Sequence, residues 1–166
     1  MKKNKLRLDK NRNKNLPLFQ ITYRLYHRRN NTVWKMIFKA LHRMASWFYK
    51  CEIPVKTEIG DCLYIGHPYC ITINPHSTIG NNCNIHKGVT IGQENRGKRK
   101  GAPNIGNKVW IGVNSTIVGN IHIGDDVLIA PNTYVNCDIP PHSIVFGNPC
   151  IIKSVANATD GYIDNL

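Results

Sequence analysis

A histidine and a glutamate fifteen residues apart are the side chains of this sequence best suited to chemistry. His67 stands in the segment IGHPY, and Glu52 stands in the segment CEIP. A carboxylate that fixes the tautomer and orientation of an imidazole leaves its other ring nitrogen free to take a proton from a hydroxyl group. The pair therefore predicts general-base catalysis on a hydroxyl, and a structural ion pair is the alternative.

The other histidines are expected to be ordinary surface side chains. His86 and His122 each stand beside an isoleucine of the repeat described below, so both should point outward. His76 lies near a corner of that repeat, and His142 lies in the turn that closes it.

The element that must position His67 and Glu52 is a repeat with an aliphatic residue at every sixth position. A period of six fits neither an α-helix nor an ordinary strand. It predicts an all-β fold, a parallel β-helix whose aliphatic side chains stack inward while Gly or Asn takes the corners. An antiparallel domain with many turns is the alternative. Since a coil takes about eighteen residues, fifteen residues nearly return the chain to the same corner, one layer away. The aliphatic positions are Ile53, Ile59, Ile65, Ile71, then Ile73, Ile79, Ile85, Ile91, then Ile105, Ile111, Ile117, Ile123, Ile129 and Val135.

Two interruptions of the repeat point to function. A slip of two residues follows His67 directly. Fourteen residues separate Ile91 from Ile105, so residues 93–104 must leave the coil as a loop, within the segment GQENRGKRKGAPN. The loop carries the basic residues Arg96, Lys98, Arg99 and Lys100, and excursions from a regular scaffold often carry function. A harmless insertion is the alternative.

The charge is concentrated at the N-terminus. Fourteen of the 22 Lys and Arg residues, but only Asp9 among the ten acids, lie in residues 1–50. From Asn31 or Thr32 to Lys50, apolar residues recur at helical spacing and predict a basic amphipathic helix. Its apolar face is expected to cover the first coil of the solenoid, and peripheral contact with an anionic membrane is the alternative. The apolar residues are Trp34, Ile37, Phe38, Leu41, Ala45 and Phe48.

Three parts are therefore expected along the chain. Residues 1–50 form a basic, partly disordered tail with the amphipathic helix, residues 51–153 form the β-helix, and residues 154–166 form a loose C-terminal tail. No apolar run approaches the ~20 residues of a spanning helix, and the lysine-rich start lacks the apolar core of a secretory signal, so a cytoplasmic protein is expected. The six cysteines form no C-x-x-C pair, and no metal site is expected.

The motifs together resemble the serine acetyltransferase branch of the left-handed β-helix acyltransferases, over about residues 50–153. The motifs that carry the resemblance are the hexapeptide repeats, CEIP, GHP, the excursion loop and the closing segments PPHS and GNP. The resemblance implies a left-handed coil, acetyl-CoA as cosubstrate, a homotrimer, and a catalytic dyad of His67 with Glu52, where the serine enzymes usually carry Asp. It also implies a cofactor groove between subunits, formed by Gly112, Val113, Ala130, Pro131 and the turn at Gly147, with Lys153 near the phosphates.

Two departures from the family pattern bear on the acceptor. The serine enzymes hold the amino acid with an Asp before the catalytic histidine and an Arg-His pair late in the loop, whereas this chain has Gly66 and Gly101-Ala102. A site for serine must satisfy an ammonium and a carboxylate group, so a hydroxyl of a sugar or surface polysaccharide is preferred as the acceptor. The corner left by Gly66 and Ala102 should be open to a bulky ring. Serine, as in cysteine biosynthesis, is the alternative acceptor.

Two non-enzymatic functions are the remaining alternatives. The β-helix could serve as a scaffold, or the basic tail could bind nucleic acid. Nucleic acid is disfavoured as a partner because the aromatic residues of the basic segment lie on the apolar face of the predicted helix, where they form no stacking platform.

Overall fold

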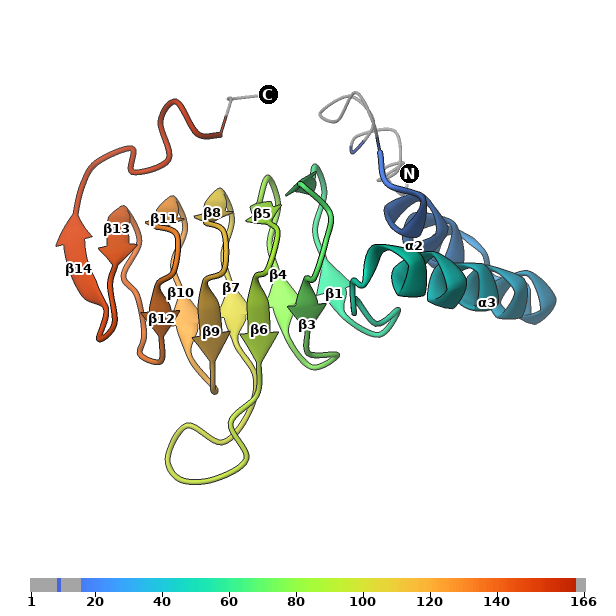
Figure 1. The fold of residues 1–166 in the computed structure, drawn as a ribbon, viewed down its shortest axis with the longest axis horizontal. Coiled ribbons are helices and arrows are strands. Elements are labelled where there is room, and N and C mark those ends of the chain that lie inside the picture. The colour runs from blue at the N-terminus through green and yellow to red at the C-terminus, as the bar shows by residue number, and fades with distance from the viewer. Residues whose placement is uncertain (1–8, 10–15, 164–166) are drawn as a thin grey trace.

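The protein is a solenoid of short parallel strands with helices at its N-terminal end (Figure 1). The structure is a computed structural model and describes Asp9 and residues 16–163. Each of the first four coils contributes one strand to each of three sheets, and β13 and β14 extend the second sheet. The first sheet contains β1 (Glu58–Ile59), β4 (Thr78–Ile79), β7 (Asn104–Ile105) and β10 (His122–Ile123). The second sheet contains β2 (Tyr64–Gly66), β5 (Asn84–His86), β8 (Val109–Ile111), β11 (Val127–Ile129), β13 (Ser143–Phe146) and β14 (Ile151–Ser154). The third sheet contains β3 (Thr72–Ile73), β6 (Thr90–Gly92), β9 (Thr116–Val118) and β12 (Tyr134–Val135).

The aliphatic repeat forms the core of the solenoid. Isoleucines of successive coils lie directly opposite one another in the parallel ladders, as Ile59, Ile79 and Ile105 do in the first sheet. Most of these side chains are completely buried. Burial of apolar area at about 25 cal/mol per Å² stabilises such a stack. The predicted parallel solenoid is therefore confirmed.

The corners between the first and second sheets are built alike in successive coils. Each contains a non-glycine residue with a left-handed backbone, and these residues are Cys62, Asn82, Lys108, Asp126 and His142. Beside them, the side-chain oxygens of Asn81, Asn107 and Asp125 accept hydrogen bonds from backbone N–H groups of the preceding coil. The corner polar groups are thereby paired from coil to coil.

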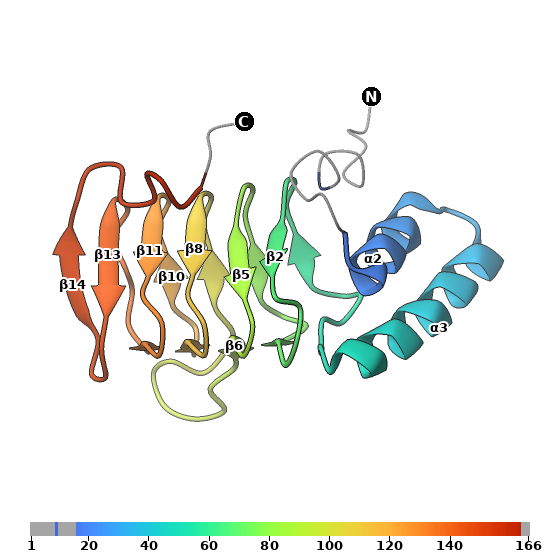
Figure 2. The ribbon, with the colours of Figure 1, turned by 45° about the horizontal axis from the view of Figure 1, so that its top comes forward.

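The helix α3 (Thr32–Tyr49) confirms the helix predicted for this segment. The side chain of Asn31 caps it and accepts hydrogen bonds from the backbone N–H groups of Val33 and Trp34. A second helix, α2 (Leu18–Arg28), was not expected from the sequence. Figure 2 shows α2 beside the first coil and the N-terminal half of α3 extending away from it.

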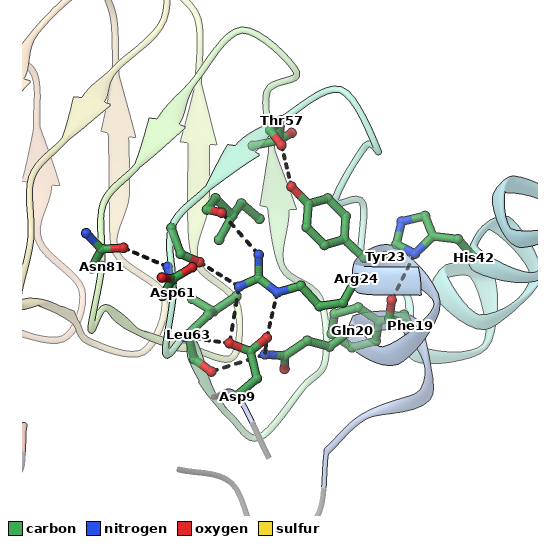
Figure 3. Close-up of polar contacts among 12 residues, drawn as sticks. Asp9, Phe19, Gln20, Tyr23, Arg24, His42, Thr57, Asp61, Leu63 and Asn81 are labelled. Atoms are coloured by element: carbon green, nitrogen blue, oxygen red, sulfur yellow. Dashed lines mark hydrogen bonds and ion pairs between the residues drawn. The ribbon is translucent and has the colours of Figure 1, made fainter. Parts of the chain in front are cut away.

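It is α2 that closes the N-terminal end of the solenoid. Its side chains Phe19 and Tyr23 are buried in the hydrophobic core, and the Tyr23 hydroxyl donates to the carbonyl of Thr57. Beside them lies a buried ion pair, in which the Nε of Arg24 stands 2.7 Å from Asp9 (Figure 3). The same guanidinium donates to the carbonyls of Ile59 and Gly60, so α2 is attached to the first coil by apolar and polar contacts.

The expected role of the apolar face of α3 is therefore largely wrong. Among its residues, only His42 and Ala45 are buried, while Trp34, Ile37, Leu41 and Phe48 are exposed. The physical reason is that α2 already occupies the end of the solenoid, so α3 packs mainly on α2. No described helix is long and apolar enough to cross a membrane.

The segment that follows β14, as far as Ile163, is packed against the solenoid, which corrects the expectation of a loose tail there. The strand β14 pairs antiparallel with β13 and ends the parallel series. Beyond it, Ala158, Thr159 and Ile163 are buried. The carboxylate of Asp126 accepts hydrogen bonds from the backbone N–H groups of Ala158 and Thr159 and from the Thr159 hydroxyl, which fixes this segment against the solenoid.

Candidate active site

His67 lies on a corner that protrudes from the first coil, between the second and third sheets. Gly66 pairs with His86, and Thr72 pairs with Thr90. Between these paired positions the first coil advances by six residues and the second coil by four, so the first coil has two extra residues at this corner. His67 is exposed and has a left-handed backbone with φ of 54°. A non-glycine residue in that region is uncommon outside tight turns and functional sites. The two-residue slip in the sequence is the cause of this protrusion.

Glu52 lies beside β3, the strand that follows this corner. It forms a bridge with Thr72 at the start of the third sheet, its N–H donates to Ile71, and its carbonyl accepts from Ile73. The predicted return to the same side of the solenoid is therefore present at the backbone level. Both Glu52 and His67 are exposed, and no hydrogen bond or ion pair joins their side chains in the described structure. Their catalytic pairing stays a prediction.

His86 occupies the space beside Gly66, which sequence reasoning missed. A Cβ atom at position 66 would lie 2.5 Å from the Nδ1 atom of His86. The expectation of an open corner at Gly66 is therefore wrong, because this imidazole fills it. Burial lowers the pKa of His86, and the neighbouring His67 lowers it further, so the ring is neutral near pH 7. The contact connects two coils, and only the inter-coil register, which the two-residue slip alters, could have revealed it.

The residues predicted to hold the cofactor form one edge that begins at the His67 corner. In the register of the second sheet, Gly112 follows His86, and Ala130 follows Gly112. The N–H of Gly112 donates to Ile129, and a Cβ atom at Gly112 would lie 2.5 Å from the backbone nitrogen of Pro131. The edge is therefore closely packed backbone with small side chains.

The remaining cofactor candidates extend this edge toward the C-terminal end. The backbone carbonyl of Val113 accepts from the N–H of Asn132, and the carbonyl of Gly147 accepts from the N–H of Tyr134. Lys153 lies on β14 opposite Ile144 and is exposed. Five of the candidates therefore lie along this edge, whereas Lys153 lies within the second sheet, three residues along β13 from Gly147. Whether the six residues bind a cofactor stays a prediction.

The predicted loop leaves the solenoid at a different corner, between β6 and β7, and projects away from it (Figure 1). Glu94 and Gly101 bridge its base, and Arg99 forms an exposed ion pair of 2.9 Å with Glu94. The backbone carbonyl of Arg99 accepts from the N–H of Asn120, which attaches the loop to the next coil. Within one chain, the loop and His67 therefore lie at separate corners.

A cleft of about 1170 Å³ lies elsewhere, along the first sheet and under the C-terminal end of α2. Its lining includes Arg28, Glu58 and His122 but none of the predicted site residues. The candidate site is instead a protruding corner and an edge, which a single chain leaves open. In the described part of the chain, no three His, Cys, Asp or Glu side chains are grouped to hold a metal ion.

Comparisons with known proteins identify the family of this chain. Residues 102–137 match the family described as bacterial transferase hexapeptide (six repeats). The serine acetyltransferase of Helicobacter pylori (strain ATCC 700392 / 26695) is 34% identical over 128 residues, covering 77% of this chain and 75% of that protein. Serine acetyltransferase 2 of Arabidopsis thaliana is 32% identical over 138 residues, covering 83% of this chain and 43% of that protein.

Solved structures give the same result. The serine acetyltransferase of Brucella abortus strain S19 in complex with coenzyme A superposes with a TM-score of 0.72 at 26% identity, covering 82% of this chain and 54% of that chain. The enzyme of Neisseria gonorrhoeae in complex with serine gives a TM-score of 0.66 at 31% identity, with coverage of 82% and 54%. This chain thus spans little more than half the length of the solved enzymes. It belongs to the serine acetyltransferase family, the acetyl-CoA-dependent acetyltransferases built on a left-handed β-helix of hexapeptide repeats.

Proposed function

We propose that this protein is an acetyl-CoA-dependent O-acetyltransferase in which His67 is the general base and Glu52 positions its ring. The observation that carries the proposal is the protruding His67 corner, from which the edge formed by Gly112, Ala130 and Gly147 begins. Family membership supports the reaction class, and the protruding corner supports the choice of His67 as the base.

The reaction needs one proton acceptor and one site for negative charge. A ring nitrogen of His67 takes the proton of the acceptor hydroxyl, and the oxygen attacks the thioester carbonyl of acetyl-CoA. The tetrahedral intermediate collapses by breaking the carbon–sulfur bond, and the proton on His67 passes to the leaving thiolate. Backbone N–H groups near the loop would stabilise the developing oxyanion. The anionic phosphates would lie toward Lys153, at the far end of the edge.

The comparisons favour serine as the acceptor, whereas the sequence alone favoured the hydroxyl of a sugar. The relatives that match are named serine acetyltransferases, and the Neisseria gonorrhoeae enzyme was solved with serine. We therefore propose O-acetylation of serine as the first candidate activity.

One observation favours the sugar hydroxyl as a second candidate. The position where the serine enzymes carry Asp is Gly66 here, and the space beside it holds the neutral ring of His86. A neutral imidazole can hydrogen-bond a sugar hydroxyl but gives an ammonium group no opposite charge, and an unpaired buried charge costs several kcal/mol. A sugar hydroxyl therefore needs only a hydrogen-bonding group at this corner, whereas the ammonium group of serine needs a negative charge.

Thiol release from acetyl-CoA, measured with serine, nucleotide sugars and oligosaccharides, tests the proposal. His67→Ala should lower turnover about 100-fold or more, whereas the matched variant His122→Ala, which changes an exposed histidine of the first sheet, should retain it. Near-normal turnover of His67→Ala would transfer the role of base to His86 or His76. A specificity constant for serine equal to or above that of the best sugar would exclude the second candidate.

The proposal includes a homotrimer. Within one chain, the His67 corner lies in the first coil between the second and third sheets, and the loop leaves a later coil between the third and first sheets. A ring of three chains would bring the loop of one chain to the His67 corner of the next. Sedimentation should then show three chains per particle. A monomer that retains full activity would contradict this part of the proposal.

A further inference from the structure

We propose that α3 is a membrane-surface helix, which holds the protein against an anionic lipid bilayer by its exposed apolar face. The first observation is the size of that face. Eight large apolar side chains of α3 are exposed, among them Trp47 at 72% and Phe48 at 70%. At 3.6 residues per turn they form one continuous arc of roughly 160° around the helix. The set is Val33, Trp34, Met36, Ile37, Leu41, Met44, Trp47 and Phe48.

The packing of the helices explains why this face is unused within the chain. The buried side chains of α3 are His42 and Ala45. His42 points to the opposite side, toward α2 and the first coil, and Ala45 lies at the border of the arc. The Nδ1 atom of His42 lies 2.9 Å from the carbonyl of Phe19, and its Nε2 atom lies near the carbonyl of Ile53. The helix is thus fixed by one face, and the larger apolar face stays outside. An apolar arc of this width on a solvated helix indicates an interaction surface.

Charge decides which occupant fits. Lys39, Arg43 and Lys50 are exposed and follow one edge of the arc on the helical wheel. No acidic residue occurs between positions 10 and 51, and the single earlier acid, Asp9, is buried against Arg24. A second copy of α3 placed on the same face would bring cations against cations with no carboxylate to pair them. Anionic headgroups supply the missing charge, at about 1 kcal/mol per Lys or Arg near the surface.

The two tryptophans support a helix that lies flat. Trp34 stands near the N-terminal end of α3 with Arg29 5.6 Å from its ring centre, and Trp47 stands near the C-terminal end with Lys50 4.1 Å from its ring centre. The two positions are about 20 Å apart along the axis at 1.5 Å per residue. Tryptophan beside a cation is typical of the boundary between headgroups and acyl chains. Both ends of α3 therefore carry a tryptophan and a cation that can lie at the same depth in the membrane.

The test uses the full-length protein and vesicles of phosphatidylcholine with phosphatidylglycerol, against vesicles of phosphatidylcholine alone. Co-sedimentation should require the anionic lipid and weaken as salt is raised. Arg43→Glu should lower the partition coefficient at least about fivefold. The matched charge reversal Lys56→Glu, at an exposed position of the first coil, should leave it nearly unchanged. Trp47→Ser should also lose binding, and Ile151→Ser, an exposed apolar residue at the other end of the molecule, should keep it.

Each contrary result would overturn the proposal. These are failure of the native protein to bind anionic vesicles, or binding by Trp47→Ser and Arg43→Glu equal to that of the native protein. A third is that no lipid binds while Trp47→Ser halves the particle mass in sedimentation, which would assign the face to a second copy of the chain. The acetyltransferase assay is separate, so the outcome does not depend on the proposed function.

Discussion

The two ends of the solenoid are closed by different chemistry, although a buried aspartate stands at the centre of each closure. At the N-terminal end, Asp9 is paired with Arg24, and both side chains are almost completely buried (Figure 3). At the C-terminal end, Asp126 accepts hydrogen bonds mainly from the neutral groups of Ala158 and Thr159, with His142 as an exposed fourth donor.

The difference shows what each closure requires. A buried ion pair is stable only while both partners are present, because removing one leaves an unpaired charge in a medium of low polarity. Where neutral groups donate to a carboxylate, the strength of the hydrogen bonds depends on whether that carboxylate is ionised. The N-terminal closure should therefore be the more sensitive to mutation, and the C-terminal closure the more sensitive to acid.

The largest effect is expected from Arg24→Met, which leaves Asp9 buried without its cation. The free energy of unfolding should fall by about 3–5 kcal/mol. Arg28→Met removes an exposed cation from the same helix and should change stability by less than about 0.5 kcal/mol. Thermal unfolding at one fixed protein concentration measures both variants. If the two variants melt together, the buried pair does not secure the cap.

A smaller effect is expected from Asp126→Ala at the opposite end. Burial raises the pKa of this carboxyl, but hydrogen bonds from Thr159 and His142 outweigh it and lower the pKa to about 2. The ionised form is thus favoured by folding, which contributes about 2 kcal/mol that is fully present above pH 4 and lost as the pH falls through 2.

Proteolysis of residues 155–163 as a function of pH measures this closure. The native tail should become cleavable only in strong acid, the Asp126→Ala tail already at neutral pH, and the control Asp160→Ala, at an exposed position, should behave as native. A native tail that is cleaved equally at every pH would show that Asp126 does not hold it.

The sequence predicted the parts of the fold that repeat. Isoleucines at a six-residue interval specify stacked coils, because each coil presents the same side chain to the next. The length between Ile91 and Ile105 alone requires a loop. The α3 helix carried its own start signal in Asn31.

Contacts that occur only once in the fold could not be predicted from the six-residue repeat. The pair Asp9–Arg24 and the docking of α2 join segments without any repeated spacing. The helical pattern of α3 showed that one face is apolar, but a pattern cannot say which neighbour covers it. The contact of His86 with Gly66 depends on the register between two coils of unequal length. The cofactor candidates were chosen from the resemblance to the acetyltransferases and not from the repeat, and their binding role stays a prediction. The Glu52–His67 pairing depends on two exposed side chains, which no period can place.

The smallest effect is expected from Tyr23→Phe, and it returns to the N-terminal closure. The lost hydroxyl leaves the buried carbonyl of Thr57 without its donor, which should cost about 1 kcal/mol at neutral pH. Burial raises the pKa of Tyr23 to about 12, so the neutral phenol is favoured by folding. Its contribution is present below pH 10 and is lost as the pH rises through about 12. The N-terminal closure should therefore weaken in alkali, where the C-terminal closure does not.

Thermal unfolding measured across this alkaline range separates the two contributions. The native protein should lose stability steeply between pH 10 and 12, whereas Tyr23→Phe should start about 1 kcal/mol lower and show a shallower slope. Tyr26→Phe, which changes a less buried tyrosine of the same helix, should keep the native slope. If Tyr23→Phe and the native protein lose stability in parallel above pH 10, ionisation of Tyr23 does not limit the closure. The alkaline weakness would then have to come from the helix as a whole, and only the acid sensitivity of Asp126 would distinguish the two ends by pH.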